Sequence, residues 1–388
     1  MHMPDIASLM RDPAVAKALA WVDASSETVI QEAIRVCEIP SPTFEEAERA
    51  AYVKDRFAAL GLADVTIDRA GNVRGRRPGA GGGPGVAVGA HLDTVFPTGT
   101  DVRVTRDGTR LLAPGIGDNS VAVAALLAMV EALNAGRVRT AGDLYLTSNT
   151  GEEGLGDLKG MKVFVEDVKD RVKALVALEG MKINRVIHIA VGSRRYRVTF
   201  TARGGHSWGH FPSPSAIHIL GRAIADISRL EVPADPRTTY NVGLVRGGTT
   251  VNTIASEAEM LVDLRSVDVQ VLADLERRVL GIIERTAGEG NGKVALDLVG
   301  DRPAGSIPVT HPVVEICKAV HRVLGLRTFT EASSTDVNAA LGAGLPGVCL
   351  GITEGGNEHR LDEYIETGPI PTGVTNVLLA TVALAGNV

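Results

Sequence analysis

Apolar runs typical of buried β-strands recur along this chain, and three of them lead directly to His, Asp or Glu. VAVGAHLD at residues 86–93 is an unbroken apolar run that reaches His91 and Asp93, while DLYLTSNTGEE at 143–153 and ALVALEG at 174–180 also arrive at carboxylates. Unbroken apolar runs belong to strands that are covered on both faces of a parallel sheet. Helical patterns alternate with these runs. The sequence therefore predicts an α/β fold with a doubly wound, mostly parallel sheet.

The region before these runs predicts two helices and one strand. Apolar residues recur at helical spacing over residues 29–37. Thr43 and Glu46 form the Thr-x-x-Glu pattern of a capping box, which predicts a second helix that runs to Gly61. Residues 65–74 are expected to form a strand.

The hydrophobic pattern changes near Gly192. Apolar and polar residues then alternate, one strand-like region covers residues 249–267, and the predicted order of elements is β-α-β-β-α-β. This order is that of a small ferredoxin-like α+β domain. Because the βα pattern resumes afterwards, we expect residues 192–301 to be inserted into a discontinuous catalytic domain made of residues 1–191 and 302–388.

Composition narrows the class of protein. With 45% hydrophobic and 22% charged residues, the chain has the balance of a soluble globular protein. Its net charge of −6, without a long run of one sign, argues against nucleic acid as a partner. The N-terminus lacks the apolar stretch of a signal peptide, and no membrane-spanning segment of ~18 apolar residues is expected. We expect a cytoplasmic protein without a membrane partner, whose cysteines Cys37, Cys317 and Cys349 are buried and reduced.

Five side chains that can bind metal ions follow the strand-like runs or lie in loops beside them. They are His91, Asp118, Glu153, Glu179 and His359. Ligands of open α/β sheets bind beyond the carboxyl ends of the strands, where these residues are expected. Each has an ordinary explanation when taken alone, such as a helix N-cap for Asp118 or an exposed loop position for His359. Together, two histidines and three carboxylates predict the site of a two-metal hydrolase.

The motifs around these residues resemble those of the co-catalytic zinc peptidase and deacylase superfamily. The matching segments are His91-Leu92-Asp93, Gly117-Asp118-Asn119, Gly151-Glu152-Glu153-Gly154, Leu178-Glu179-Gly180, Gly205-His206-Ser207 and Glu358-His359-Arg360-Leu361-Asp362-Glu363. This superfamily includes peptidase T, bacterial glutamate carboxypeptidase, aminoacylase, acetylornithine deacetylase and succinyl-diaminopimelate desuccinylase. The resemblance extends from about Pro40 to Glu366, and it is far more specific for the superfamily than for a substrate.

The resemblance implies how the five residues share two Zn²⁺ ions. Asp118 would bridge the ions. Glu153 and His359 would complete one site, and His91 and Glu179 would complete the other. Imidazole and carboxylate ligands suit Zn²⁺, and carboxylate-rich dinuclear sites also accept Co²⁺ or Mn²⁺. Two such ions would activate a water molecule and polarise the carbonyl group of a substrate.

Two acidic residues are implied to act beside the ligands. Glu152 would be the general base, which takes a proton from the attacking water and passes it to the leaving amine. Asp93 would accept the second N–H of the His91 ring and so hold its orientation.

The inserted segment carries the remaining implied residues. His206 would help to stabilise the oxyanion, in this superfamily often from the partner subunit. Asn252 and Arg265 match positions that contact substrate, although a turn amide and an ion pair on a strand are alternatives. The chain departs from the family pattern after His206-Ser207, where Trp208 and His210 appear. His210 could be a second functional histidine or a structural, exposed residue.

The resemblance also implies the roles of the two domains. The inserted domain would be a lid and the dimerisation surface of a homodimer, with a small peptide or N-acyl amino acid bound between the domains. The leading interpretation is a metal-dependent hydrolase that acts as a short-peptide exopeptidase, either an aminopeptidase or tripeptidase or a carboxypeptidase. An N-acyl amino acid deacylase is the alternative. A non-catalytic binder is disfavoured because the site is complete, with all five ligands, Asp93 and Glu152 present. A structural metal protein is disfavoured because it has no use for Glu152.

Overall fold

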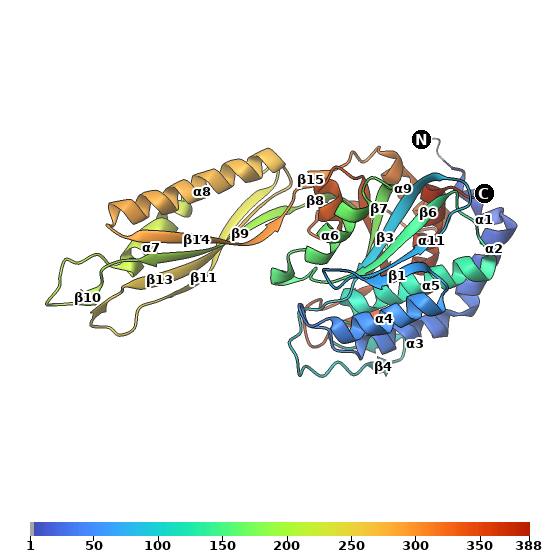
Figure 1. The fold of residues 1–388 in the computed structure, drawn as a ribbon, viewed down its shortest axis with the longest axis horizontal. Coiled ribbons are helices and arrows are strands. Elements are labelled where there is room, and N and C mark those ends of the chain that lie inside the picture. The colour runs from blue at the N-terminus through green and yellow to red at the C-terminus, as the bar shows by residue number, and fades with distance from the viewer. Residues whose placement is uncertain (1–3) are drawn as a thin grey trace. The chain divides into compact units, whose positions relative to one another are not determined.

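The computed structural model describes residues 4–388 (Figure 1). The described chain forms two compact units, one made of the residues up to Ala190 together with Ser306–Val388, and the other of Val191–Gly305. We call them the large unit and the small unit. The large unit is thus assembled from both ends of the sequence.

The large unit is built on one mixed β-sheet. Among the described residues, its strands lie in the order β1-β2-β6-β3-β7-β17-β8-β15, with β16 beside β8. Neighbouring strands are parallel from β6 to β17, whereas β1, β2 and β8 join through antiparallel pairs. The strands are β1 Ala63–Ile67, β2 Val73–Arg77, β3 Gly83–His91, β6 Gly142–Asn149, β7 Val172–Met181, β8 Arg185–Ala190, β15 Gly305–Ser306, β16 Phe329–Ser333 and β17 Gly347–Thr353. The predicted α/β class is confirmed, with a parallel centre and antiparallel strands outside it.

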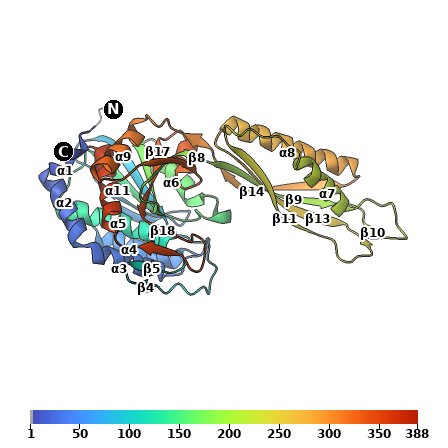
Figure 2. The same cartoon turned by 180° about the vertical axis from the view of Figure 1, so that it is seen from behind.

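Helices cover both faces of this sheet (Figures 1 and 2). They are α1 Ile6–Arg11, α2 Pro13–Ala24, α3 Ser26–Cys37, α4 Ala47–Ala59, α5 Val121–Gly136, α6 Lys159–Val168, α9 Pro312–Val323, α10 Val337–Gly342 and α11 Ile370–Ala385. Val86 and Val88 of β3 join the main core with α5 and α11. Ala87, which points to the opposite face, packs with α6 and α10. Because both faces are covered, this strand is apolar at successive positions.

The expectation that the sequence contains no segment long and apolar enough to span a membrane is wrong for one helix. Counted with the turn before α5, Ile116–Gly136 is long and apolar enough to cross a membrane by length and composition. In the structure, 89% of its apolar window is buried inside the protein. The segment is accounted for as the central helix of the large unit, apolar all round because other elements surround it.

The main sheet of the small unit is antiparallel and has two helices packed on it. Its described strands lie in the order β11-β13-β9-β14, and its buried side chains form a separate core. Along the chain, the elements are β9 Gly192–Thr201, α7 Ala216–Ile227, β11 Thr238–Gly247, β13 Glu257–Ser266, α8 Val269–Glu289 and β14 Lys293–Arg302. This is the predicted β-α-β-β-α-β order. The strand-like region at 249–267 is divided, since a short strand, β12 (Thr253–Ile254), pairs with β10 (Gly205–His206) before β13 begins.

A small antiparallel sheet in the large unit supports the last ligand-bearing loop. Its described strands lie in the order β18-β19-β5-β4. They are β4 Thr105–Asp107, β5 Arg110–Leu112, β18 Gly355–Gly356 and β19 Tyr364–Glu366. The loop that joins β18 to β19 contains His359. All three cysteines are buried and free in the described structure, as predicted.

Two local predictions near the N-terminus are wrong. Residues 65–74 do not form one strand, because β1 and β2 pair as an antiparallel hairpin across a turn in this region. Thr43 does not open a capping box, since α4 begins at Ala47 and its N-cap residue is Glu46, whose side chain makes no capping hydrogen bond in the described structure. The side chains of Thr43 and Glu46 instead contact Asp93 and Gly151, far along the chain.

Candidate metal centre

The five predicted metal ligands converge at one edge of the central sheet. His91 is the last residue of β3, Glu179 lies near the end of β7, and Glu153 follows β6. Asp118 lies in the turn just before α5, and His359 lies in the loop between β18 and β19. Because β6, β3 and β7 are parallel, their carboxyl ends meet at this edge. The structure therefore brings together residues that are widely separated in sequence.

Asp118 is the shared member of two groups of potential ligands. Its Oδ1 lies 3.1 Å from Nε2 of His91, and that nitrogen lies 3.7 Å from Oε2 of Glu179. Its Oδ2 lies 3.1 Å from Nε2 of His359, which lies 3.0 Å from Oε1 of Glu153. Each group offers one ligand atom per residue, and these atoms lie within 4.8 Å of one another. Asp118 thus faces the two groups with different oxygen atoms, as a bridging carboxylate does.

The spacing of these atoms suits a small divalent ion. Ligand atoms about 2.1 Å from a tetrahedral Zn²⁺ ion lie about 3.4 Å from one another, and the four contacts span 3.0–3.7 Å. Oδ1 of Asp118 is buried and has no hydrogen bond in the described structure, although Nε2 of His91 is so close. Oδ1 of Asp118 and Nε2 of His91 thus lie close together without forming a hydrogen bond. This geometry suits two ligand atoms that both point at one metal ion.

The electrostatics of the cluster also favour cations. Burial lowers the pKa of His91, but the neighbouring carboxylates, Asp118 foremost, outweigh burial and raise the pKa well above its ordinary value. Hydrogen bonds with Asp118 and Glu153 raise the pKa of His359 to about 11. Burial raises the pKa of Glu153 and of Glu179. Without metal, the cluster therefore attracts protons, which divalent ions would displace on binding.

The turn that carries Asp118 is held by Glu363. One carboxylate oxygen of Glu363 accepts the backbone N–H groups of Gly117 and Asp118, at 2.7 and 2.9 Å. Glu363 is fully buried, and burial raises its pKa to about 7. The side-chain amide of Asn119 donates to the carbonyl of Leu178 in β7 at 2.9 Å. The turn is therefore attached on both sides, which fixes the Asp118 carboxylate relative to β7.

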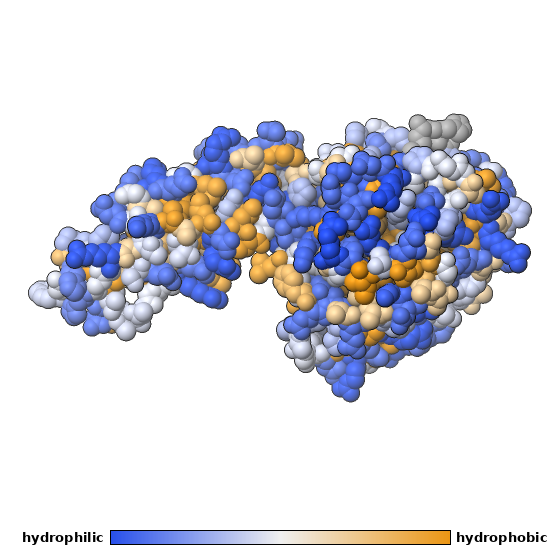
Figure 3. All heavy atoms as spheres, in the orientation of Figure 1, coloured by the Kyte–Doolittle hydropathy of each residue, from blue (hydrophilic) through white to orange (hydrophobic). Residues whose placement is uncertain are grey.

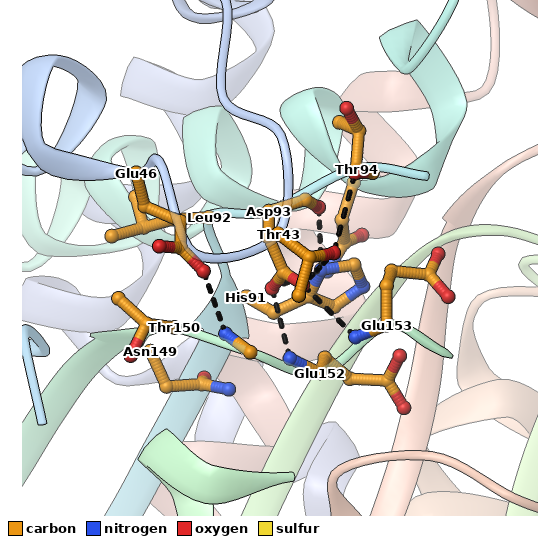
Figure 4. A network of polar contacts seen from close by, with 12 residues as sticks. Thr43, Glu46, His91, Leu92, Asp93, Thr94, Asn149, Thr150, Glu152 and Glu153 are labelled. Atoms are coloured by element: carbon orange, nitrogen blue, oxygen red, sulfur yellow. Dashed lines mark hydrogen bonds and ion pairs between the residues drawn. The ribbon is translucent and has the colours of Figure 1, made fainter. Parts of the chain in front are cut away.

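Asp93 lies beside the His91 ring, but its closest contact with the ring is through its main chain. The backbone carbonyl of Asp93 lies 3.0 Å from Nδ1 of His91, whereas the carboxylate lies 3.6 Å away. The carboxylate instead accepts the N–H groups of Glu152 and Glu153 and the hydroxyl of Thr43, all at 2.9 Å (Figure 4). The nearest partner of Nδ1 is therefore the main-chain carbonyl, and the carboxylate adds a longer ion-pair contact. A proton on Nδ1 leaves Nε2 facing Asp118 as the ligand atom.

Glu152 and Glu153 are adjacent but differ in their surroundings. Both side chains are buried, with 5% and 7% of their surface exposed. Glu153 belongs to the ligand group that includes His359, whereas Glu152 belongs to neither group. This division matches the two roles expected of them, a metal ligand and a general base.

The small unit carries His206 in a defined tautomer. Nδ1 of His206 accepts the backbone N–H groups of Trp208 and Gly209, both at 3.2 Å. A ring nitrogen that accepts hydrogen bonds carries no proton, so the proton of the neutral ring lies on Nε2, which becomes a donor. Nδ1 of His210 accepts the backbone N–H of His206 at 2.7 Å. His210 thus supports the main chain of His206, whereas Trp208 is 90% exposed.

Asn252 and Arg265 also lie in the small unit and have local partners. The backbone carbonyl of Asn252 accepts the N–H of Ser207 at 3.0 Å, and its side chain accepts the hydroxyl of Thr250 at 3.0 Å. Arg265 in β13 donates to Asp263 at 2.6 Å. These contacts are those of the alternatives considered from sequence, a turn amide and an ion pair on a strand. His206 and Asn252 lie on paired segments, whereas all five predicted metal ligands belong to the large unit.

Thr43, Glu46 and Glu363 support this region in ways that were not predicted from sequence. Thr43 and Glu46 match the pattern of a helix cap, and the motif that contains Glu363 assigns it no role. The nearest sequence signal was for Glu363, which lies four residues after His359 in the same motif. From a single sequence, a side chain that caps its own helix cannot be distinguished from one that accepts a hydrogen bond from a distant loop.

Comparisons with known proteins agree with this geometry. The chain matches peptidase family M20/M25/M40 over residues 87–382. The acetylornithine deacetylase of Salmonella arizonae is 25% identical over 302 residues, which cover 74% of this chain and 76% of that protein. A tripeptidase structure from Staphylococcus aureus superposes with a TM-score of 0.80 at 23% identity, covering 93% of this chain and 98% of that one. The aminopeptidase PepT of Bacillus cereus superposes with a TM-score of 0.78 at 22% identity, covering 93% and 99%.

The family match covers well over half of the chain and includes all five residues of the two ligand groups. The resemblance inferred from the motifs is therefore confirmed. The protein is a metal-dependent hydrolase that belongs to peptidase family M20/M25/M40.

Proposed function

We propose that this protein is a dinuclear-zinc hydrolase that cleaves a peptide or N-acyl amide bond of a small substrate, and that it acts as an exopeptidase on short peptides. The observation that carries the proposal is the position of Asp118. Its two carboxylate oxygens each lie 3.1 Å from a different histidine, His91 and His359. One carboxylate shared between two ligand groups is the arrangement that a two-metal site requires.

The proposed ligands divide into two sets around Asp118, with His91 and Glu179 on one side and Glu153 and His359 on the other. When bound, the ions supply Lewis acidity, which lowers the pKa of a water molecule and polarises the substrate carbonyl. The chain itself supplies the fixed geometry, since Glu363 holds the bridging residue through two N–H groups.

Glu152 is the proposed general base. It takes a proton from the attacking water and delivers it to the nitrogen of the cleaved amide, so that an amine leaves and a carboxylic acid remains. The proposed donor to the oxyanion is Nε2–H of His206, and Asn252 and Arg265 are proposed to bind substrate. These three roles rest on the family resemblance of the motifs.

The choice of substrate is supported by the relatives. The tripeptidase and the aminopeptidase PepT superpose on 93% of this chain, which favours a short peptide. The second candidate, an N-acyl amino acid deacylase, is supported by the acetylornithine deacetylase that is 25% identical to this chain.

A homodimer through the small unit is part of the proposal. In its described sheet, β11 is an edge strand, and an unpaired edge is a ready site for a second chain. Val245 on β11 is 53% exposed, and Figure 3 shows further apolar residues at the surface of this unit. Sedimentation velocity of the metal-loaded protein tests this point, and a purely monomeric species at micromolar concentration contradicts it.

The decisive test of function uses two matched substrates with zinc-loaded protein. One is a tripeptide with a free N-terminus, and the other is its C-terminal amino acid blocked by an acetyl group. Cleavage of the tripeptide alone supports the exopeptidase, and cleavage of the acetylated amino acid alone supports the deacylase. Glu152→Ala protein is the control for contaminating hydrolases. Cleavage of neither compound by protein with its metal bound contradicts both candidates.

A further inference from the structure

Four consecutive backbone N–H groups in the loop after β6 are held by side chains from distant parts of the chain. The N–H groups of residues 150–153 donate in turn to Asn72, to Glu46 and, for the last two, to Asp93, at 3.0, 3.0, 2.9 and 2.9 Å. None of these bonds belongs to a helix or to a strand pair. The conformation of the loop that presents Glu152 and Glu153 therefore depends on three side-chain acceptors.

Glu46 supplies the second of these acceptors. It stands at the start of α4, yet its side chain makes no capping bond in the described structure, and it is only 7% exposed. Its carboxylate oxygen accepts the N–H of Gly151, which is 105 residues away in sequence. Figure 4 shows the carboxylate directed at the backbone just before Glu152. Burial of a carboxylate destabilises the folded state unless the carboxylate is hydrogen-bonded. The bond to Gly151 therefore helps to offset the burial of Glu46.

The same short segment reaches the site at two further points. The hydroxyl of Thr43 donates to the carboxylate of Asp93 at 2.9 Å. Arg49, which is 1% exposed, donates to the backbone carbonyl of Leu92 at 2.7 Å. Residues 43–49 therefore buttress both the end of β3 and the loop after β6.

We propose that Glu46 is a positioning residue for Glu152 and Glu153. This inference rests on the proposed function, in which these two residues are the general base and a metal ligand. Glu46 acts through Gly151, whose φ of +63° lies in the left-handed region that glycine adopts readily. The hydrogen bond to the Glu46 carboxylate restricts the backbone conformation of Gly151. A shift of about 1 Å in a reacting group lowers rates by about 10²-fold, so a small release of the loop has a large kinetic effect.

The direct test compares Glu46→Ala with Glu46→Gln, because glutamine keeps an oxygen that accepts the N–H of Gly151 and alanine does not. The assay uses whichever matched substrate the zinc-saturated wild type cleaves. Glu46→Ala is expected to lower kcat by about 10- to 100-fold with KM within about threefold, and Glu46→Gln to keep kcat within about threefold. A wild-type kcat in Glu46→Ala, or equal losses in both variants, would overturn the proposal.

The matched control is Glu45→Ala. Glu45 is the exposed neighbour of Glu46, and its carboxylate accepts the hydroxyl of Thr98 outside the site. Its removal is expected to leave kcat unchanged. If Glu46→Ala does not fold, Glu46→Asp replaces it, since the shorter side chain keeps the charge but withdraws the acceptor. Glu46→Asp is then expected to behave as predicted for Glu46→Ala, and wild-type kinetics would overturn the proposal.

A second readout does not depend on activity. Amide hydrogen exchange at Gly151, measured on metal-free protein, is expected to be faster in Glu46→Ala and restored in Glu46→Gln. Unchanged exchange at Gly151, even with a lowered melting temperature, would mean that Glu46 stabilises the fold without positioning the loop.

Glu152→Ala is measured beside these variants to separate the two claims. An unchanged kcat in Glu152→Ala would show that the proposed function assigns the wrong base. A collapse of kcat in Glu152→Ala with none in Glu46→Ala would show that only the positioning role is wrong.

Discussion

The carboxylate of Asp93 accepts the backbone N–H of Glu152 at 2.9 Å. The main chain of the proposed base is thus fixed independently of its side chain. The bonds from the loop to Glu46 and Asn72 also do not involve the Glu152 side chain. The chemistry of Glu152 can therefore be tested without dismantling the site.

Glu152→Ala should retain bound metal and a KM within about threefold of wild type, with kcat lower by about 10²- to 10⁴-fold. The proton transfer is lost while the ligands remain. Steady-state kinetics together with metal analysis check this expectation. Glu166→Ala, which changes an exposed glutamate paired with Lys169 on α6, is the control. A kcat within a few fold of wild type would assign the base to another residue.

His210→Ala should lower kcat because it releases the main chain of His206. His210→Asn should preserve kcat, since the asparagine oxygen can take the place of Nδ1 as acceptor. His206→Ala removes the proposed oxyanion donor and should cost about 10²- to 10³-fold. Kinetics of the three variants are compared with His218→Ala, an exposed histidine of α7. A full loss in His206→Ala with none in His210→Ala would leave His210 without a positioning role.

His321 should make the large unit sensitive to acid. Burial lowers the pKa of His321 to about 4, and its ring lies between the hydroxyl of Thr328 at 3.0 Å and the amide of Asn376 at 3.2 Å. A histidine in the unfolded chain has a pKa of about 6.5. Between these two values the unfolded state binds more protons, so the free energy of unfolding falls as the pH drops from about 6.5 to 4.

The free energy of unfolding should fall by on the order of 2–3 kcal/mol over this pH range. The full contribution of His321 is present above about pH 6.5, the pKa of histidine in the unfolded chain. Urea unfolding of metal-free protein at several pH values measures it. His321→Gln should show a smaller decline, and His218→Gln should decline like wild type. Parallel curves for all three proteins would mean that His321 does not control the acid response.

The fold and the convergence of the five candidate ligands could be predicted from sequence because both follow from patterns along single segments. The continuous apolar run before His91 indicates a strand covered on both faces, and parallel strands present their last residues at one edge. Asp118 follows from the same logic, since it stands at the start of a buried helix. Motif resemblance then separated Glu152 from Glu153, which spacing alone does not.

The supports of the site could not be predicted because they are contacts between distant segments. Thr43 and Glu46 fit the sequence pattern of a local capping box. In the folded chain, however, their side chains form hydrogen bonds with Asp93 and Gly151 instead. The family resemblance assigns Asp93 to the ring of His91, but in the structure its carboxylate also accepts three other donors. A local sequence pattern indicates only partners that are close in sequence. It therefore does not predict hydrogen bonds between distant segments.

The most direct test of the two-metal site is the amount of zinc bound per chain in wild type and in Asp118→Ala. Protein reconstituted with zinc and freed of excess ion is analysed by inductively coupled plasma mass spectrometry, and melting curves confirm that the variant is folded. If Asp118 bridges both ions, wild type holds two zinc ions per chain and Asp118→Ala loses both. One ion in wild type, or a variant that loses only one, would contradict a shared carboxylate at the centre of the site.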